Sequence, residues 1–197
     1  PSLLARLTAE DPRVVAHRHA RNEGAYYNFQ FGVDRVATPY FSILSDDDLL
    51  FPDLYRRAVE VLEADRSLGF YAAQVVLYDV VRGTHALRPS KGWRAGRHGA
   101  GESARLMTEH HFVWTGCVFR REVRDALGPF ETVPMGDILF LGKAAAAFPF
   151  FVDLRPGALF SETGSNFSRT LPVGELLRSH AVAKAWAESL PGLTPED

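Results

Sequence analysis

Three aspartates, Asp46, Asp47 and Asp48, stand side by side in the sequence between two apolar runs. The residues just before them, 40–44, are mainly aromatic or branched, which is typical of a buried strand. Pro52 follows shortly and suits the first turn of a helix, because its φ is fixed and it lacks an N–H. We therefore expect the carboxylates in a tight turn at the carboxyl end of a core strand, where open α/β sheets bind ligands.

Adjacent carboxylates beside an apolar core repel one another unless a positive charge lies among them. Hard divalent cations such as Mg²⁺ bind carboxylate oxygens and complete their shell with waters and substrate phosphates. The acidic turn is therefore a candidate metal site. The alternatives are a solvated acidic turn or an aspartate that caps the next helix, although Asp48 is too far from Pro52 to cap it directly.

Length, charge and cysteine content limit the class of protein. The 197 residues are enough for one ordinary domain with a substantial core. The formal net charge of −2 predicts no broad attraction to nucleic acid. Cys117 is the only cysteine, which fits a reducing, cytoplasmic compartment. Since no apolar run approaches the roughly 20 residues that cross a bilayer, we expect no transmembrane segment.

Hydrophobic periodicity predicts the other elements. Helices are expected over 2–7, 25–36, 52–68, 102–110, 121–127, 138–148 and 172–190, and strands over 13–19, 40–44, 69–81, 112–120 and 150–160, the last broken at 155–157. The segment 89–101 is expected as a loop, either a mobile lid over a phosphate-bearing ligand or a solvated surface loop. Its basic residues are Lys91, Arg94, Arg97 and His98.

The stretch 40–52 resembles the Asp-x-Asp motif of GT-A-fold glycosyltransferases, in particular the large inverting family 2. In that family a strand ends on the metal-binding acids, and a proline-initiated helix follows. The acid usual at the first position is Ser45 here, so the metal contact is either Asp46-x-Asp48 or Asp47 alone. We favour Asp47 and Asp48 at the metal, with Asp46 supporting them at the donor site.

The pattern Asn22-x-Gly24, with Asn28 and Gly32 at helical spacing after it, also resembles family 2. There the corresponding helix packs beneath the nucleotide-sugar site, which implies that Asn22 and Asn28 lie near the donor. A helix preceded by a turn, with small residues for close packing, is the simpler interpretation.

A glycine-containing segment, 112–120, is followed by a basic helix start that resembles the family pattern. The resemblance implies that Trp114, Thr115 and Gly116 approach the transferred sugar. A glycine within a strand often marks close approach of a ligand to the backbone. Trp114 could equally be an ordinary core residue.

The segment 130–137 and the alanine-rich helix after it resemble the family region in which an acid just before a helix is the general base. The resemblance implies that Asp137 is this base. The usual Glu-Asp pair is Gly136-Asp137 here, so one carboxylate remains. The alternative is that Asp137 caps the helix.

Many family members carry a histidine near 161–168 that completes the metal shell or contacts the diphosphate, and this chain has none there. Glu162 is the nearest substitute oxygen ligand for a metal, and Ser165 and Ser168 could contact phosphate. A plain polar turn is the alternative.

The resemblance implies a fold of the GT-A class, a Rossmann-like mixed α/β sheet flanked by helices, in a single domain over 1–197. Family 2 domains begin with a strand, a helix and a second strand that bind the nucleotide base and ribose. We expect this amino-terminal part to be missing here, so that the chain holds the carboxyl-terminal three-quarters of the domain. The alternative is a divergent domain. A sheet without those strands would have an unpaired edge.

The implied activity is metal-dependent, inverting transfer of a sugar from a nucleoside-diphosphate sugar to an acceptor hydroxyl. The acceptor would be a glycan, a lipid-linked compound or a small natural product. Asp137 would take the hydroxyl proton. Mg²⁺ or Mn²⁺, held by Asp47 and Asp48 with Glu162, would offset the charge of the leaving diphosphate.

Two other functions remain open from the sequence. A sugar-phosphate nucleotidyltransferase on a related fold would need a glycine-rich, Lys/Arg-bearing loop for the triphosphate, and none is visible. A non-catalytic module that binds a carbohydrate or a nucleotide sugar is favoured by the departures at Ser45 and Gly136 and by the missing histidine.

Overall fold

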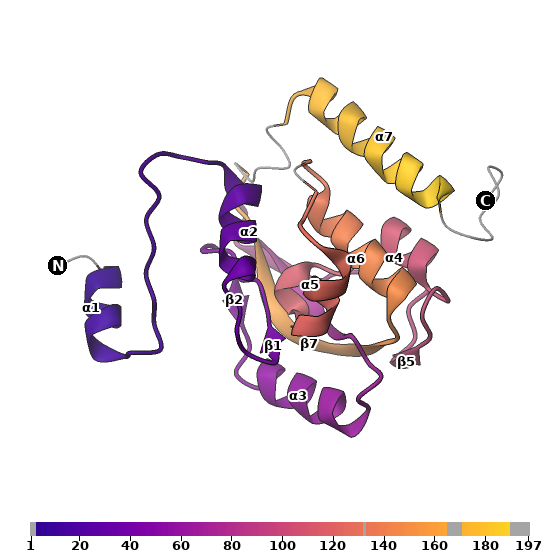
Figure 1. Ribbon diagram of the computed structural model, residues 1–197, viewed down its shortest axis with the longest axis horizontal. Helices are drawn as coiled ribbons and strands as arrows, with labels where there is room; N and C mark the ends of the chain where they lie inside the picture. The colour runs from indigo at the N-terminus through magenta and orange to yellow at the C-terminus, as the bar shows by residue number, and fades with distance from the viewer. Residues whose placement is uncertain (1–2, 132, 165–170, 190–197) are drawn as a thin grey trace.

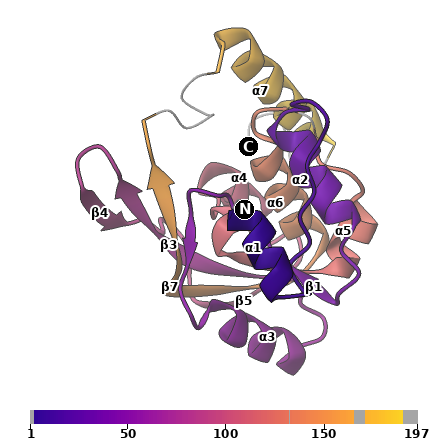
Figure 2. The same ribbon diagram turned by 90° about the vertical axis from the view of Figure 1, so that its left-hand side faces the viewer.

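The structure, a computed structural model, describes residues 3–131, 133–164 and 171–189. It is built on one mixed sheet with helices against both faces (Figures 1 and 2). This confirms the α/β fold, with a mixed sheet and flanking helices, that the sequence predicts.

Seven strands form the sheet in the described part of the chain: β1 (Tyr40–Phe41), β2 (Leu49–Leu50), β3 (Phe70–Asp79), β4 (Thr84–Leu87), β5 (Gly96–His98), β6 (Cys117–Arg120) and β7 (Phe150–Glu162). The order is β1-β6-β3-β7-β2, with β4 paired to β3 and β5 paired to β7 outside this path. The central pair, β3 and β7, is parallel, and the other pairs are antiparallel. The acidic turn joins β1 and β2, at opposite ends of the strand order.

The helices of the described residues are α1 (Leu3–Glu10), α2 (Ala25–Asp34), α3 (Leu54–Ala64), α4 (Ala104–Glu109), α5 (Arg121–Leu127), α6 (Gly136–Ala147) and α7 (Val173–Glu188), with a 3₁₀ turn, η1 (Trp114–Gly116). In Figure 1, α3 lies below the sheet, and α4, α5 and α6 lie above it. Helix α1 stands apart in the same view, and none of its residues is buried.

Strand β3 supplies side chains to two separate cores, because successive residues of a strand point to opposite faces. Phe70 and Ala72 belong to the core that also contains residues of α4, α5 and α6. Tyr71 and Ala73 belong to the core formed with α3. The long apolar run of β3 is thus explained by burial on both faces.

An aromatic ladder crosses the sheet from β1 to β7. The ring of Phe41 stacks on Phe119 at 5.2 Å, Phe119 on Phe70 at 5.5 Å, and Phe70 on Phe150 at 4.6 Å between centroids. Stacked rings contribute about 0.5–1.5 kcal/mol per pair beyond the area they bury. The ladder therefore anchors the short strand β1, which leads into the acidic turn, to the centre of the sheet.

Strand β7 is continuous where the sequence predicts a break at 155–157. Its pairing with β3 jumps from Asp153 to Pro156, which is a bulge. The carboxylate of Asp153 inside the bulge accepts hydrogen bonds from Arg57, at 2.7 Å from Nη1, and from the hydroxyl of Tyr71. The predicted break is therefore wrong, because buried polar bonds hold the irregular residues within the sheet.

Three expected strands are absent or shorter. Residues 13–19 form no strand, and Val15 is 88% exposed, so this prediction is wrong. The predicted strand rests only on the alternation of apolar and polar residues. No strand of the described sheet pairs with this segment to share its backbone hydrogen bonds. The strands expected over 40–44 and 112–120 are reduced to β1 and β6, and η1 occupies the middle of the second stretch.

The segment 89–101, expected as a loop, contains β5, which pairs with β7. His98 at the end of β5 is 3% exposed. Its ring nitrogens lie 2.9 Å from Ser103 Oγ and 2.9 Å from the carbonyl oxygen of Arg94. The expectation of an irregular loop is therefore wrong over β5, because a buried histidine holds it against the sheet.

The predicted helices all occur, several with ends displaced by a few residues. Helix 121–127 coincides with α5, whereas helix 52–68 is reduced to α3. Ser2 and Leu190, the outer ends of the first and last predicted helices, lie outside the described residues. No helix in the described ranges is both long and apolar enough to cross a bilayer.

We expect Gly157→Ala to lower the free energy of unfolding by about 1–3 kcal/mol, the usual cost of overpacking. A Cβ at Gly157 would lie 2.6 Å from Ala73 Cβ and 2.7 Å from Leu54 Cδ1. Gly32→Ala is the control, since a Cβ there meets nothing within 4 Å and alanine favours a helix. Urea unfolding measures both variants, and equal stabilities would contradict the packing described for the bulge.

Candidate functional site

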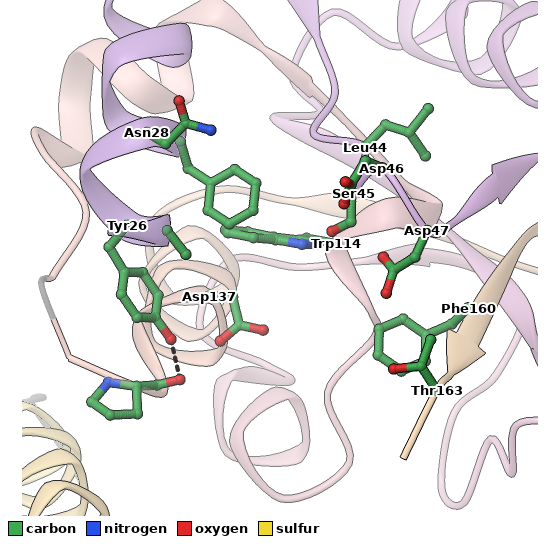
Figure 3. A pocket seen from close by; sticks show the side chains of 13 residues that line it. Tyr26, Asn28, Leu44, Ser45, Asp46, Asp47, Trp114, Asp137, Phe160 and Thr163 are labelled. Carbon is green, nitrogen blue, oxygen red and sulfur yellow. Dashed lines mark hydrogen bonds between the residues drawn. The ribbon is translucent and has the colours of Figure 1, made fainter. Parts of the chain in front are cut away.

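A pocket of about 660 Å³ lies beside the acidic turn (Figure 3). It is lined from several elements: α2, the acidic turn, η1, the start of α6 and the end of β7. Three carboxylates, Asp46, Asp47 and Asp137, belong to its lining. None of its described lining residues is a lysine, arginine or histidine, so the charge it presents is negative.

The acidic turn divides its aspartates between the pocket and the core. The turn closes through a hydrogen bond from the N–H of Asp48 to the carbonyl oxygen of Ser45, 3.3 Å long. Asp46 and Asp47 line the pocket, whereas Asp48 is 5% exposed and does not. Thr115 Oγ1 donates to Asp48 Oδ2 at 2.6 Å, and the N–H of Ser161 donates to Oδ1 at 3.0 Å.

Burial raises the pKa of Asp48, and the bonds from Thr115 and Ser161 counter that rise, while the neighbouring Asp47 and Asp46 add to it. Ser161 also donates its hydroxyl to the carbonyl oxygen of Asp47, at 2.5 Å. The end of β7 therefore holds two successive residues of the turn.

Asp137 lies in the first turn of α6 and faces the pocket across from Asp47 (Figure 3). The cap residue of α6 is Met135, which makes no side-chain cap bond. Burial raises the pKa of Asp137, partly offset by the N–H groups of Ile138 and Asp137 and by the charge of Arg88. A carboxylate with a raised pKa accepts a proton more readily at neutral pH, as a general base must.

Tyr26 holds the turn ahead of Asp137. Its hydroxyl, at the start of α2, donates a hydrogen bond to the carbonyl oxygen of Pro134. A Cβ at Gly136 would lie 2.3 Å from the carbonyl oxygen of Glu131 and 3.3 Å from Tyr26 Cε1. This close packing explains why glycine stands where the resemblance leads one to expect a glutamate.

The structure separates the expected donor residues of η1. Trp114 lines the pocket, although it is only 7% exposed, and its ring packs edge-on against Phe29 at 4.7 Å. Thr115 is fully buried against Asp48. Gly116 lies against β3, where a Cβ would be 2.7 Å from the carbonyl oxygen of Ala73. Trp114 is thus both a core residue and part of the pocket wall, and the other two lie behind it.

Asn28 lines the pocket from α2. Asn22 does not line it, and its Oδ1 accepts a hydrogen bond from the N–H of Gly24, 2.9 Å long, in the turn before α2. Both asparagines line a neighbouring hollow of about 500 Å³ along residues 17–25. The two hollows share Ala25 and Asn28 in their linings.

Glu162 ends β7 and does not line the pocket, whereas the next residue, Thr163, does. The carbonyl oxygen of Glu162 accepts a hydrogen bond from the N–H of Val80, which fixes the strand end. Ser165 and Ser168 lie outside the described residues.

Within the described ranges, no group of three or more histidine, cysteine, aspartate or glutamate side chains is arranged to hold a metal ion. A cation held by Asp47 would have to complete its shell with waters and substrate phosphates, as Mg²⁺ commonly does. A pocket lined by carboxylates also repels a diphosphate unless a cation lies between them.

Sequence reasoning missed three residues of this site. Tyr26 and Phe29 stand three residues apart in the predicted helix after Asn22-x-Gly24, so helical spacing could have placed these two side chains on one face. Ser161 acts through its backbone N–H as well as its hydroxyl, and no sequence signal shows that a backbone donor is directed at Asp48.

Comparisons with known proteins agree on the fold. The sequence model of the family described as "Glycosyl transferase family 2" matches residues 1–128. A structure of S. aureus TarS 1–349 in complex with UDP-GlcNAc aligns with a TM-score of 0.64 and 12% identity, over 87% of this chain and 50% of that chain. A structure of S. aureus TarS 1–349 aligns with a TM-score of 0.61 and 11% identity, over 80% of this chain and 47% of that chain. A search of curated proteins found no match.

The chain spans about half the length of these solved structures. At such low identity the likeness is one of fold. It confirms the GT-A-like architecture expected from the sequence, and the family match covers the acidic turn and η1.

We expect Thr115→Val to lower the free energy of unfolding by about 1–3 kcal/mol, because the buried carboxylate of Asp48 loses a donor. Since burial raises the pKa of Asp48, more of it is protonated at pH 4 than at pH 7, and the loss should be larger at pH 7. Urea unfolding at both pH values measures this. Thr115→Ser keeps the hydroxyl and is the control, and an equal loss in both variants would contradict the role given to that bond.

Proposed function

The chain belongs to glycosyl transferase family 2, and on that basis we propose that it carries out metal-dependent, inverting transfer of a sugar. The donor is a nucleoside-diphosphate sugar, and the acceptor is a hydroxyl of a glycan, a lipid-linked compound or a small natural product. The single cysteine, Cys117, fits a reducing compartment, and we propose a cytoplasmic location.

One observation carries the proposal: Asp47 and Asp137 line the same pocket from two different elements. Inverting transfer needs a base on the acceptor side and positive charge on the leaving-group side. Asp137, with its raised pKa, suits the first task. Asp47, on the fixed acidic turn, suits the second task by holding a cation.

In the proposed reaction the acceptor hydroxyl attacks the anomeric carbon of the sugar from the face opposite the nucleoside diphosphate. The carboxylate of Asp137 takes the hydroxyl proton as the new bond forms. Bound Mg²⁺ or Mn²⁺ supplies positive charge beside the leaving diphosphate. Asp47 would hold this cation, with Asp46 beside it, while Asp48 keeps the turn in place from beneath.

The aromatic wall of the pocket suits a sugar ring, because Trp114 and Phe29 present apolar surface next to the carboxylates. The S. aureus TarS structure with UDP-GlcNAc makes a UDP-sugar the first donor to test. A thermal-shift screen of UDP-, GDP- and dTDP-sugars with Mn²⁺ identifies the donor, because a ligand that binds the native state raises the melting temperature.

We expect Asp137→Asn to abolish transfer, with a loss of at least about 100-fold, while donor affinity changes little. The asparagine amide keeps the shape of the aspartate side chain, but it cannot take the proton of the acceptor hydroxyl. Release of nucleoside diphosphate, coupled to product detection by mass spectrometry, measures turnover. Glu131→Gln is the control, because Glu131 lies in the same loop and pairs with Lys143. Near-normal turnover by Asp137→Asn would remove the base assignment.

We expect UDP-GlcNAc, or the donor that the screen selects, to bind at least tenfold more tightly with Mn²⁺ than with EDTA. Asp47→Asn should lose that difference, because it removes the charge that holds the cation. The tenfold ratio corresponds to about 1.4 kcal/mol of binding free energy. Isothermal titration calorimetry measures both. Asp125→Asn, on the exposed side of α5, is the control. Equal affinity in Mn²⁺ and EDTA would contradict the metal assignment.

A further inference from the structure

Asp137 stands at the amino-terminal end of α6, where a helix has the least support of its own. The cap residue, Met135, makes no side-chain cap bond, and the first helical residue, Gly136, is of the type that loses most backbone freedom on folding. The first N–H groups of a helix have no acceptor within it. The position of Asp137 therefore depends on what holds the residues just before it.

Helix α2 reaches this place through Tyr26. The Tyr26 hydroxyl donates a hydrogen bond to the carbonyl oxygen of Pro134, three residues before Asp137 (Figure 3). Its ring also packs beside Gly136, where a Cβ would lie 3.3 Å from Tyr26 Cε1. Tyr26 and Asp137 line the same pocket. One side chain thus bonds the backbone ahead of the carboxylate and fills the space next to it.

Gln30 makes a second bond from the same face of α2, since residues four apart are neighbours on a helix. Its Oε1 accepts a hydrogen bond from the N–H of Phe130, 2.7 Å long. Its Nε2 donates to Asp34 Oδ1, which fixes the amide orientation. Phe130 is only 7% exposed, and its ring packs edge-on against Phe140 of α6 at 4.7 Å. Helix α2 therefore holds the segment before α6 at two places.

Helix α2 can hold this segment because α2 is itself fixed to the core. Arg124 Nη1, from α5, donates to the carbonyl oxygens of Val33 at 2.8 Å and Val36 at 2.9 Å. These bonds satisfy carbonyl groups at the carboxyl end of α2, which have no partner within the helix. The ring of Phe29 packs edge-on against Trp114 at 4.7 Å. The helix is thus fastened at its end and near its middle.

Other contacts of the segment hold it less firmly. Lys143 of α6 pairs with Glu131 at 2.6 Å, but the two side chains are 25% and 41% exposed, and an ion pair in water contributes little. The N–H of Gly136 bonds to the carbonyl oxygen of Val133 at 2.8 Å, which shapes the turn without tying it to another element. The two bonds from α2 are the ones that connect this turn to a fixed part of the fold.

We propose that Tyr26 and Gln30 are positioning residues for the transfer reaction, and that their bonds to the backbone of Pro134 and Phe130 fix the carboxylate of Asp137 within the pocket. The consequence for catalysis rests on the proposed function, whereas the positioning does not depend on which sugar is transferred. Misplacement of a reacting group by about 1 Å can cost about 100-fold in rate. Loss of either bond should therefore slow transfer without weakening donor binding.

Amide hydrogen exchange, followed by NMR, tests the positioning without any turnover. In Tyr26→Phe, exchange at Gly136 and Leu139 should become about fivefold faster or more, because their N–H groups bond within the turn and first helical residues that lose support. The control is Tyr27→Phe, which removes a hydroxyl from a 62% exposed tyrosine on the same helix. It should leave both rates unchanged.

The same measurement tests Gln30. Gln30→Lys keeps a long polar chain but offers no acceptor, so the N–H of Phe130 should also exchange about fivefold faster or more. Gln30→Glu keeps an acceptor oxygen at this position and should preserve most of the wild-type protection. Should Gln30→Lys fail to fold, Gln30→Met removes the acceptor with an apolar chain of similar length.

Once a donor is known, kinetics test the consequence for catalysis. The kcat of Tyr26→Phe should fall about 10- to 100-fold, while donor affinity by calorimetry stays near the wild-type value. Tyr27→Phe should match the wild type in both. A role in stability alone would lower the melting temperature and leave the kcat of the folded variant unchanged.

Unchanged exchange at Gly136 and Leu139 in Tyr26→Phe would overturn the inference. Faster exchange combined with a wild-type kcat would overturn it as well, because the bond would then hold the turn without affecting the reaction. Failure of the wild-type protein to transfer any sugar would instead contradict the proposed function. The exchange rates would in that case still decide whether α2 holds the segment before Asp137.

Discussion

The buried carboxylate of Asp48 is the interaction on which the site depends. It joins three segments that are far apart in the sequence: the acidic turn, η1 through Thr115, and the end of β7 through Ser161. A desolvated carboxylate is tolerated only when hydrogen bonds replace its water, so neither donor can move without cost. With Asp48 fixed beneath the turn, its neighbours Asp46 and Asp47 lie at the surface of the pocket.

The consequence is a pocket whose fixed charges are negative and whose walls are partly aromatic. Carboxylates that face one hollow repel a diphosphate, which is why the proposed reaction includes a cation. Asp137 approaches from α6, and the bond from Tyr26 to Pro134 holds the turn before it. The sheet brings these groups together, because the aromatic ladder ties β1 to β7 across its centre.

The sequence predicted the parts of this site that depend on local pattern. An apolar run that ends on three aspartates placed the turn beside a strand, and helical spacing placed α2 and α6. It could not predict that Asp48 points inward, because the donor at Ser161 lies 113 residues away. The strand predicted over residues 13–19 from alternating apolar and polar residues does not form, because no described strand pairs with it. The break predicted in β7 is also wrong, because the bulge around Asp153 carries the strand past a proline. These features depend on tertiary pairing, which local periodicity does not contain.

In the proposed complex, Asp47 and Asp137 lie on the two sides of one reacting group. Anomalous diffraction at the manganese edge, from crystals grown with Mn²⁺ and UDP-GlcNAc or the donor selected by screening, tests it most directly. We expect a manganese peak between the Asp47 carboxylate and the donor diphosphate, with the anomeric carbon facing Asp137. A donor bound elsewhere, or a manganese peak away from Asp47, would contradict it.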